Sequence, residues 1–398
     1  MMRTDTAAAA GAAEHRQLLA ESVADFATRG TDLARVRRLR GTRAEYDRAV
    51  WKKMAELGWL GILVPERYGG LGLGLAEMAI VARGLARALV PEPLTATAVL
   101  AATALAAAEN DTLKEEQLPR LVAGELLPAL AWQEQAGGLD YTAIETRATP
   151  FEGGFKVNGV KRFIAGAAQA DAFLVSARGA GGVLLLWLPR EAAGAQIELE
   201  PLADGRSFGS LTLDDALVPT SGVAASGAAA VEALGRAFDH ACAITGAELA
   251  GVMDRALEMS LDYLRTREQF GKPIGAFQAL QHRAVDLYIH RELAAAVLDE
   301  ALAALDRGPA AAARAAAASR VKARCADAAA RITREAIQFH GAIGFTDEFD
   351  VGLYLKRALV LTAWLGGASW HRRRYAGVAV GVKGEGGREK GEFRERIP

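Results

Sequence analysis

Apolar residues recur at helical spacing along the first third of the chain. Before Gly58, four of them follow one another at intervals of three or four residues: Tyr46, Val50, Met54 and Leu57. This spacing puts them on one face of an amphipathic helix that ends at the glycine. The same reasoning predicts further helices over residues 75–89, 94–108 and 111–123. We therefore expect residues 14–124 to be mainly helical.

The pattern changes after residue 124. Short apolar runs, separated by glycine, aspartate and proline, occupy residues 155–157, 173–175, 183–188 and 211–213. Such punctuation is typical of strands joined by turns. The sequence FEGGF at residues 151–155 predicts a hairpin in which Gly153 and Gly154 supply positive φ angles. A β domain is therefore expected between two helical regions.

Helical spacing returns near residue 228 and continues to about residue 381. After Phe277, small and apolar residues fall on one face of a long predicted helix: Leu280, Ala284, Leu287, Ala294, Leu298, Ala301 and Leu305. The alanine-rich residues 310–318 favour helix as well, because alanine has the highest helix propensity. The charged residues 383–398 contain few apolar side chains, so we expect a disordered tail.

Composition narrows the class of protein. With 398 residues, 51% of them hydrophobic, the chain can bury a large core divided into two or three domains. A formal net charge of -1 gives no electrostatic reason to expect nucleic acid or an anionic membrane as a partner. Cys242 and Cys325 cannot form a disulfide framework, and the histidines show no metal-ligand spacing. No apolar stretch approaches the roughly 18 residues of a membrane span. We expect a soluble, cytoplasmic protein without a metal.

Two glycine-containing motifs in the second helical region are the most specific features of the sequence. REQFGKPIGAFQ starts at Arg267, and QFHGAIGF occupies residues 338–345. Three further stretches accompany them, namely GWLGILVPERYGGLGL at residues 58–73, WQE at residues 132–134 and KRFIA at residues 161–165. In this order, the motifs resemble those of the acyl-CoA dehydrogenase family over residues 46–379.

The resemblance implies a mainly α fold with a middle β domain. We expect an N-terminal helical domain (1–124), a β-barrel-like domain (125–226), a C-terminal four-helix bundle (227–382) and the tail (383–398). The resemblance also implies a homo- or heterotetramer in which FAD crosses a subunit boundary. Its expected substrate is an acyl-CoA, and its expected electron acceptor is an electron-transfer flavoprotein.

Several residues match positions that hold FAD in such proteins. Arg267 would bind the pyrophosphate, because a guanidinium fork matches paired phosphate oxygens; a solvated arginine at a helix end is the alternative. Phe163 replaces a tryptophan beside the flavin, or is an ordinary core residue, and Ala165 replaces a threonine whose hydroxyl reaches flavin N5. The remaining positions are Phe270 and Gln278 at the adenosine, Gln338, Gly341 and Ala342 at the neighbouring subunit's FAD, and Gln133 at the flavin.

The resemblance also assigns a substrate site. Phe238 and Asp239 are similar to a Phe-Asp pair that faces the acyl-CoA, where the aspartate accepts hydrogen bonds near the pantetheine arm. Cys242 stands where the family has an arginine, so the CoA contacts are only partly kept. We expect Phe238 and Asp239 to begin a bundle helix, where the charge of Asp239 would alternatively stabilise the helix dipole.

The catalytic base is missing from its usual positions. The reaction implied by the resemblance is α,β-dehydrogenation of an acyl thioester, in which a carboxylate removes the α-proton. The two glutamate positions used in the family fall at Leu365 and Ala241, and neither side chain can carry a proton. His371, Asp239 and His240 are the candidate substitutes, although position matters more than residue type.

The leading hypothesis is an FAD-binding subunit of the acyl-CoA dehydrogenase type that needs a homologous partner carrying the glutamate. Two alternatives stay open. A flavin-dependent monooxygenase on the same scaffold would need no carboxylate base, and a non-catalytic structural subunit would hold no flavin.

Overall fold

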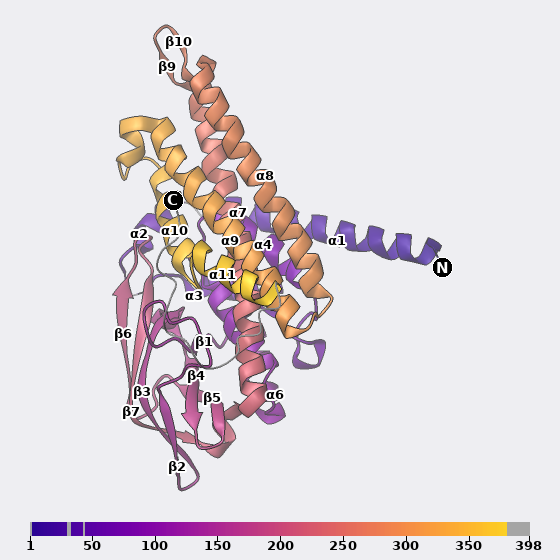
Figure 1. Ribbon diagram of the computed structural model, residues 1–398, viewed down its shortest axis with the longest axis vertical. Coiled ribbons are helices and arrows are strands. Elements are labelled where there is room, and N and C mark those ends of the chain that lie inside the picture. Colours follow the sequence, from indigo (N-terminus) through magenta and orange to yellow (C-terminus); the bar gives the residue numbers. More distant parts are fainter. Residues whose placement is uncertain (1, 30–32, 43, 380–398) are drawn as a thin grey trace, which may run out of the picture.

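The computed structural model describes residues 2–29, 33–42 and 44–379. Its elements run from an N-terminal helical domain through a middle sheet domain to a C-terminal helical bundle, as expected (Figure 1). In Figure 1 the sheet lies at the lower left, and the long helices of the bundle run through the height of the molecule. The predicted disordered tail, residues 383–398, lies outside the described residues.

Six α-helices make up most of the N-terminal domain: α1 (Met2–Arg29), α2 (Leu33–Leu39), α3 (Arg48–Glu56), α4 (Leu75–Arg87), α5 (Ala102–Ala106) and α6 (Asp111–Val122). The helices predicted over residues 75–89 and 111–123 are confirmed by α4 and α6. α3 begins after Asp47, whose carboxylate accepts a hydrogen bond from the Ala49 N–H and caps the helix. Its apolar face buries Trp51 and Met54.

The helix predicted over residues 94–108 is only partly an α-helix. Residues Thr95–Ala101 form a π-helix that leads directly into α5, and every one of them is buried. π-helical turns are rare, and they occur frequently near functional sites. Hydrophobic periodicity could not distinguish this segment from an α-helix, because apolar and small residues cover all of its faces.

The β domain is one sheet with the hydrogen-bonded order β6-β7-β3-β2-β4-β5-β8, and β1 lies parallel beside β4. Its strands are β1 (Pro128–Ala131), β2 (Arg147–Phe151), β3 (Gly154–Ala165), β4 (Ala172–Gly179), β5 (Gly182–Pro189), β6 (Ala195–Pro201), β7 (Ser207–Pro219) and β8 (Val223–Ser226). The four apolar runs of the sequence lie in β3, β4, β5 and β7, which confirms them as strands. The sheet domain has its own core, in which Phe173, Leu186 and Leu211 are at most 1% exposed.

The predicted hairpin joins β2 to β3, but only one of its two glycines supplies a positive φ. Gly153 has φ +77, whereas Gly154 already belongs to β3. Gly154 is needed for another reason, because an added Cβ would come within 2.1 Å of the Val218 carbonyl oxygen on the neighbouring strand. The prediction that Gly154 supplies a positive φ was therefore wrong. The glycine is required because a side chain would have no room beside the neighbouring strand.

The C-terminal bundle contains α7 (Gly227–Thr266), α8 (Gln278–Asp306), α9 (Ala311–His340), α10 (Val351–Ala363) and α11 (Ala368–Ala379). A short hairpin, β9 (Glu268–Gln269) and β10 (Lys272–Pro273), separates α7 from α8 at the top of Figure 1. The predicted face of α8 is confirmed, since Leu287, Ala294, Leu298, Ala301 and Leu305 are at most 4% exposed. None of the described helices combines the length and apolar character that a membrane span requires.

The end of α8 caps the start of α4. The Asp306 carboxylate accepts hydrogen bonds from the backbone N–H groups of Leu75 at 2.6 Å and Ala76 at 3.1 Å. These are two of the four N–H groups that a helix leaves without an internal partner. A Cβ at Gly74 would come within 2.7 Å of the same carboxylate, which explains the glycine. Hydrogen bonds between a side chain of the bundle and the backbone of α4 therefore join the bundle to the N-terminal domain.

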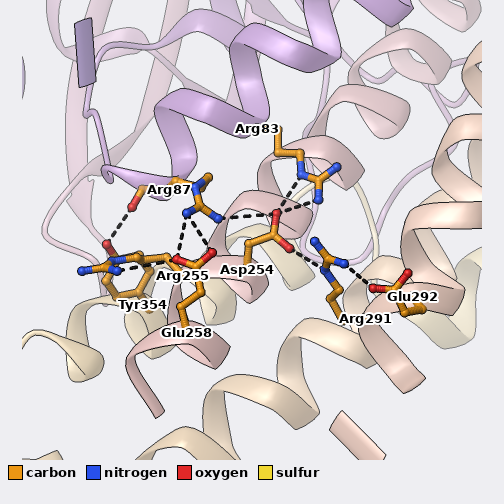
Figure 2. Close-up of polar contacts among 8 residues, drawn as sticks. All are labelled: Arg83, Arg87, Asp254, Arg255, Glu258, Arg291, Glu292 and Tyr354. Carbon is orange, nitrogen blue, oxygen red and sulfur yellow. Dashed lines mark hydrogen bonds and ion pairs between the residues drawn. The ribbon is translucent and has the colours of Figure 1, made fainter. Parts of the chain in front are cut away.

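A buried charged cluster joins the same two parts (Figure 2). Asp254 of α7 is 4% exposed, and its carboxylate pairs with Arg83 of α4 at 2.7 Å and with Arg291 of α8 at 2.8 Å. Arg87 of α4 approaches Asp254 to 3.9 Å, and its carbonyl accepts a 2.7 Å hydrogen bond from the Tyr354 hydroxyl of α10. We refer to these five residues as the Asp254 cluster.

Candidate functional site

The residues expected at the FAD pyrophosphate and adenosine lie at the far end of α7. Arg267 follows the last residue of α7 and is exposed. The neighbouring Arg265 pairs with Asp262 at 3.1 Å, whereas Arg267 pairs with no carboxylate of the described chain. Phe270, at the tip of the β9–β10 hairpin, is 91% exposed with φ +54, and Gln278 is the exposed first residue of α8. An exposed guanidinium without a counter-charge is available to a phosphate group.

The second motif lies at the same end of the bundle. Gln338 is exposed in the last turn of α9, Gly341 follows the helix with φ +64, and Ala342 is exposed. His340 is buried against Tyr263 of α7, with ring centroids 4.4 Å apart, which joins the ends of the two helices. The structure therefore brings both motifs to one exposed end of the molecule.

The expected flavin-side residues lie in the β domain, around a bulge in β3. The Arg162 N–H donates to the Gln133 carbonyl at 2.7 Å, directly before Phe163, which has φ +57 in the bulge. Ile164 is 1% exposed and takes the core position, whereas Phe163 is only half-buried. The alternative of Phe163 as an ordinary core residue is thus not supported. Ala165 ends β3 and lines a cavity.

The two groups of expected FAD residues are far apart within one chain. Ala165 shares its cavity with Glu248 of α7, and Arg267 follows Glu248 by 19 residues. At a rise of 1.5 Å per residue, this separation is roughly 30 Å along the helix. Figure 1 shows the same arrangement, with the β9–β10 hairpin at the top and β3 in the sheet at the lower left.

The cavity beside Ala165 is small and has a charged wall. Its volume is about 60 Å³, and it lies where the β domain, the π-helix, α7 and α10 meet. Glu248 accepts a hydrogen bond from the Thr95 hydroxyl at 2.5 Å and one from Arg357 at 2.6 Å. Arg357 also donates to Asp204 at 2.9 Å. Both carboxylate oxygens of Glu248 are therefore engaged, so this acid fixes the cavity wall.

Glu248 was not among the site residues predicted from the sequence. Glu248 follows Ala241 by seven residues, so both lie on one face of α7, two turns apart. This spacing is a signal in the sequence that could have found Glu248. A glutamate on the inner face of a bundle helix is uncommon and marks a polar site.

Neither expected base position carries an acid. Ala241 is 0% exposed in α7, and Leu365 is 2% exposed in the loop between α10 and α11, with φ +58. The loop is held by polar contacts to its backbone. The buried Lys322 donates from Nζ to the Gly366 carbonyl at 2.9 Å, and His371 bonds the Leu365 carbonyl at 2.9 Å. The backbone around Leu365 is thus fixed, although its side chain cannot accept a proton.

His371 is poorly suited to replace the missing base. It is 0% exposed, and its Nε2 bonds the Leu365 carbonyl while its Nδ1 bonds the Ser319 hydroxyl at 3.3 Å. Burial, with the nearby Lys322 charge, lowers the pKa of His371 to about 3. Both ring nitrogens have protein partners, so the neutral imidazole holds the loop.

Phe238 and Asp239 lie inside α7 and not at its start. The helix begins at Gly227, twelve residues before Asp239, so the dipole of the first turn does not explain this charge. Asp239 is 1% exposed and forms ion pairs with Arg314 of α9 at 3.1 Å and Arg374 of α11 at 2.7 Å. Burial raises the pKa of Asp239, and the two arginines oppose that shift. The carboxylate of Asp239 is therefore taken up by two ion pairs within the protein, which leaves it badly placed to reach a substrate proton.

Stability should fall in mild acid because of two histidines, the buried His371 and the half-buried His240, whose surroundings disfavour the charged imidazole. Burial lowers the pKa of His371 to about 3 and that of His240 to about 4, from the ordinary 6.5. Below pH 6.5 the unfolded chain takes up protons that the folded chain refuses. Acidification therefore costs up to roughly 1.4 kcal/mol per pH unit for each histidine until its folded pKa is reached.

Urea denaturation at pH 7.5, 6.5 and 5.5 measures this dependence. His371→Gln should flatten the slope between pH 6.5 and 5.5, whereas the same change at the exposed His282 should not. An equal slope in both variants would contradict the assignment to His371.

The residues around Arg267 at the end of the bundle are suited to hold FAD. Those around Phe163 in the β domain are suited to it as well, except that one hydrogen-bond donor is missing. Arg267 offers a positive charge that no carboxylate among the described residues pairs, and Gly341 allows close approach of the backbone. Ala165 has no hydroxyl to donate toward a flavin edge. Bound FAD would supply the hydride acceptor. Across the described ranges, no group of three or more His, Cys, Asp or Glu side chains is placed to bind a metal ion.

Three family models match the chain in the order of its domains. They are described as acyl-CoA dehydrogenase N-terminal domain (residues 13–125), middle domain (129–216) and C-terminal domain (231–378). Among individual relatives, acyl-CoA dehydrogenase IpdE2 of Mycobacterium tuberculosis is 32% identical over 87% of this chain and 91% of the relative. The mitochondrial isovaleryl-CoA dehydrogenase of Solanum tuberosum is 29% identical over 85% of this chain and 84% of its own.

Solved structures agree with these matches. A variant of the Tcur3481-Tcur3483 steroid ACAD is 30% identical with a TM-score of 0.84, covering 93% of this chain and 99% of that chain. The ChsE4-ChsE5 complex from Mycobacterium tuberculosis is 26% identical with a TM-score of 0.82, covering 90% and 95%. PigA with FAD and proline is 25% identical with a TM-score of 0.85, covering 93% and 98%. The chain therefore belongs to the acyl-CoA dehydrogenase family of flavoproteins.

Proposed function

We propose that the chain is an FAD-binding subunit for α,β-dehydrogenation of an acyl-CoA thioester, and that it needs a homologous subunit carrying the catalytic glutamate. One observation carries this proposal. The chain has the three domains of the fold, but both positions of the base hold buried apolar residues, Leu365 and Ala241. Removal of the weakly acidic α-proton requires a positioned base and a polarised thioester oxygen. The described chain supplies the scaffold for this reaction without the base.

The contribution of this chain's own residues is to bind and to orient. Arg267 holds a pyrophosphate by charge, and the exposed Phe270 contacts the adenosine side. Lys322 and His371 fix the backbone beside Leu365 through the carbonyls of the α10–α11 loop. Phe163 and Ala165 line the flavin side in the β domain.

Two features support an assembly in which subunits share FAD. The expected FAD residues of one chain form two groups roughly 30 Å apart along α7, and the group around Arg267 and Gln338 is exposed. One FAD would therefore contact the first group of one subunit and the second group of its neighbour. We propose a tetramer with domains at residues 1–124, 125–226 and 227–382, and an electron-transfer flavoprotein as acceptor.

The comparisons favour an unlike partner over a second copy of this chain. Two of the similar structures are named for pairs of proteins, Tcur3481-Tcur3483 and ChsE4-ChsE5. In a mixed pair, one subunit can lose its base while the other keeps a competent site. Reconstitution with a glutamate-bearing homologue tests this division of roles.

Arg267→Ala should weaken FAD binding by about 10- to 100-fold. Removal of a charge-assisted hydrogen bond to a phosphate costs on the order of 1.5–3 kcal/mol, and each 1.4 kcal/mol is a factor of ten. Flavin retained after gel filtration, and the Kd from titration of the apoprotein, measure the effect. Arg265→Ala is the matched control, because Arg265 is exposed two residues away and pairs with Asp262. Equal retention of FAD by the two variants would reject the role of Arg267.

A further inference from the structure

The Phe238–Asp239 pair, expected to face an acyl-CoA, is completely covered in this chain. Phe238 is 2% exposed and Asp239 1%. From the β domain, Trp132 and Tyr141 pack against the Phe238 ring, with centroid distances of 5.6 and 6.0 Å. From α11, Trp370 packs edge-on at 5.9 Å. The aromatic rings come from two separate domains and close over the same side chain.

Arg374 of α11 completes the cover. Its guanidinium carbon lies 5.1 Å from the Phe238 ring centroid and 5.7 Å from that of Trp370, which are cation–π distances. Its Nη2 approaches Asp239 Oδ1 to 2.7 Å, and its Nη1 donates to the Ser319 hydroxyl at 3.2 Å. The Arg374 side chain is only 14% exposed. It is therefore held from three sides.

The contact between Arg374 and Asp239 occupies the group that a ligand would need. The other oxygen, Oδ2, accepts a hydrogen bond from Arg314 Nε at 3.1 Å. Oδ1 receives no hydrogen bond of good geometry from the described residues, although the Arg374 charge lies against it. A ligand amide N–H could donate to Oδ1 only after the guanidinium had moved away.

We propose that Arg374 and Trp370 close this chain's own acyl-CoA site, so that the ester binds only in the site of the glutamate-bearing partner. This inference rests on the proposed function, which places the ester beside Phe238 and Asp239. It explains why loss of the base is tolerated here. A closed site with Leu365 at the base position cannot trap substrate unproductively, while the scaffold still holds its share of FAD.

The test is a gain of binding in the FAD-loaded, full-length chain purified alone. Butyryl-CoA is titrated by isothermal calorimetry, and the flavin spectrum is recorded in the same samples. The native chain should show no saturable binding up to about 1 mM ester. Arg374→Ala should bind with a Kd lowered at least tenfold, to about 100 μM or below, and Arg374→Ala with Trp370→Ala should bind more tightly still. If Arg374 and Trp370 only stabilised the fold, their removal would lower the affinity for butyryl-CoA. A gain in affinity therefore shows that they close the site.

Arg372→Ala is the matched control. Arg372 lies on the same helix, is 57% exposed at its side chain and pairs with Asp327 on the surface. It should leave the native result unchanged. The proposal is overturned if the native chain binds butyryl-CoA as tightly as Arg374→Ala, or if both opened variants load FAD and still bind no ester. Failure of both the native chain and its complex with a glutamate-bearing homologue to load FAD would instead overturn the proposed function itself, which the flavin spectrum shows independently.

Discussion

Co-assembly with a homologous subunit that carries glutamate at the position equivalent to Leu365 should raise acyl-CoA dehydrogenation at least about 100-fold over the chain alone. A general base contributes typically 10²–10⁴ in rate, and Leu365 and Ala241 supply none. The measurement is reduction of an artificial electron acceptor by butyryl-CoA, with the chain alone, the partner alone and the co-purified complex.

Two variants of this chain make the experiment specific. Arg267→Ala within the complex should lower both flavin content and rate, because the shared FAD loses a phosphate contact. Leu365→Glu in the chain alone should recover only weak activity, since Arg374 and Trp370 still cover Phe238. Leu365→Gln is its matched control and should recover none. Rapid dehydrogenation by the unmixed native chain would sink the proposed dependence on a partner.

Asp254→Ala should lower the free energy of unfolding by about 1.5–3 kcal/mol, the range for loss of charge-assisted hydrogen bonds, because the side chains of Arg83 and Arg291 are each 31% exposed and solvent screens their charges. Removing one member of a buried ion cluster leaves the opposite charges uncompensated. Here Arg83 and Arg291 would lose their common carboxylate, which is 4% exposed in the native chain (Figure 2). Since Asp254 joins α4, α7 and α8, we expect the loss in the transition that separates the N-terminal domain from the bundle. Urea denaturation followed by tryptophan fluorescence and by circular dichroism measures it.

Glu292→Ala is the control for Asp254. Glu292 also pairs with Arg291, but its side chain is 45% exposed. Exposed ion pairs contribute about 1 kcal/mol or less, so this variant should unfold close to the native midpoint. Comparable losses in the two variants would show that burial of Asp254 is not the source of its effect.

The order of domains could be predicted from local patterns, because each type of element has its own period. The face of α8 that contains Leu287 and Leu298 was evident from spacing alone. The π-helix at Thr95–Ala101 was not, since a segment buried on all sides has no polar face to show its period. The return of helical spacing near residue 228 agrees with the start of α7 at Gly227, but the placement of Phe238 and Asp239 at the start of the helix was wrong.

Residues of the candidate site could be predicted only where they lie within a recognisable sequence motif. Arg267 and Gln338 were placed by short glycine-containing sequences, and the structure puts both at one exposed end. The closure of Phe238 by Arg374 depends on two residues 136 positions apart, which no local pattern connects. Glu248 could be predicted in part. Its place two helical turns after Ala241 follows from the local sequence, but its hydrogen bond with Arg357, which is 109 residues away, does not.

The cap that Asp306 places on α4 has a consequence for the order of synthesis. The Leu75 N–H leaves the ribosome 231 residues before the carboxylate that accepts it. At ≈5–20 residues per second, the first turn of α4 waits roughly 12–46 s for its cap. During that interval α4 lacks both this cap and its packing contact with α8. The N-terminal domain therefore gains this cap only after the chain has been translated through the end of α8.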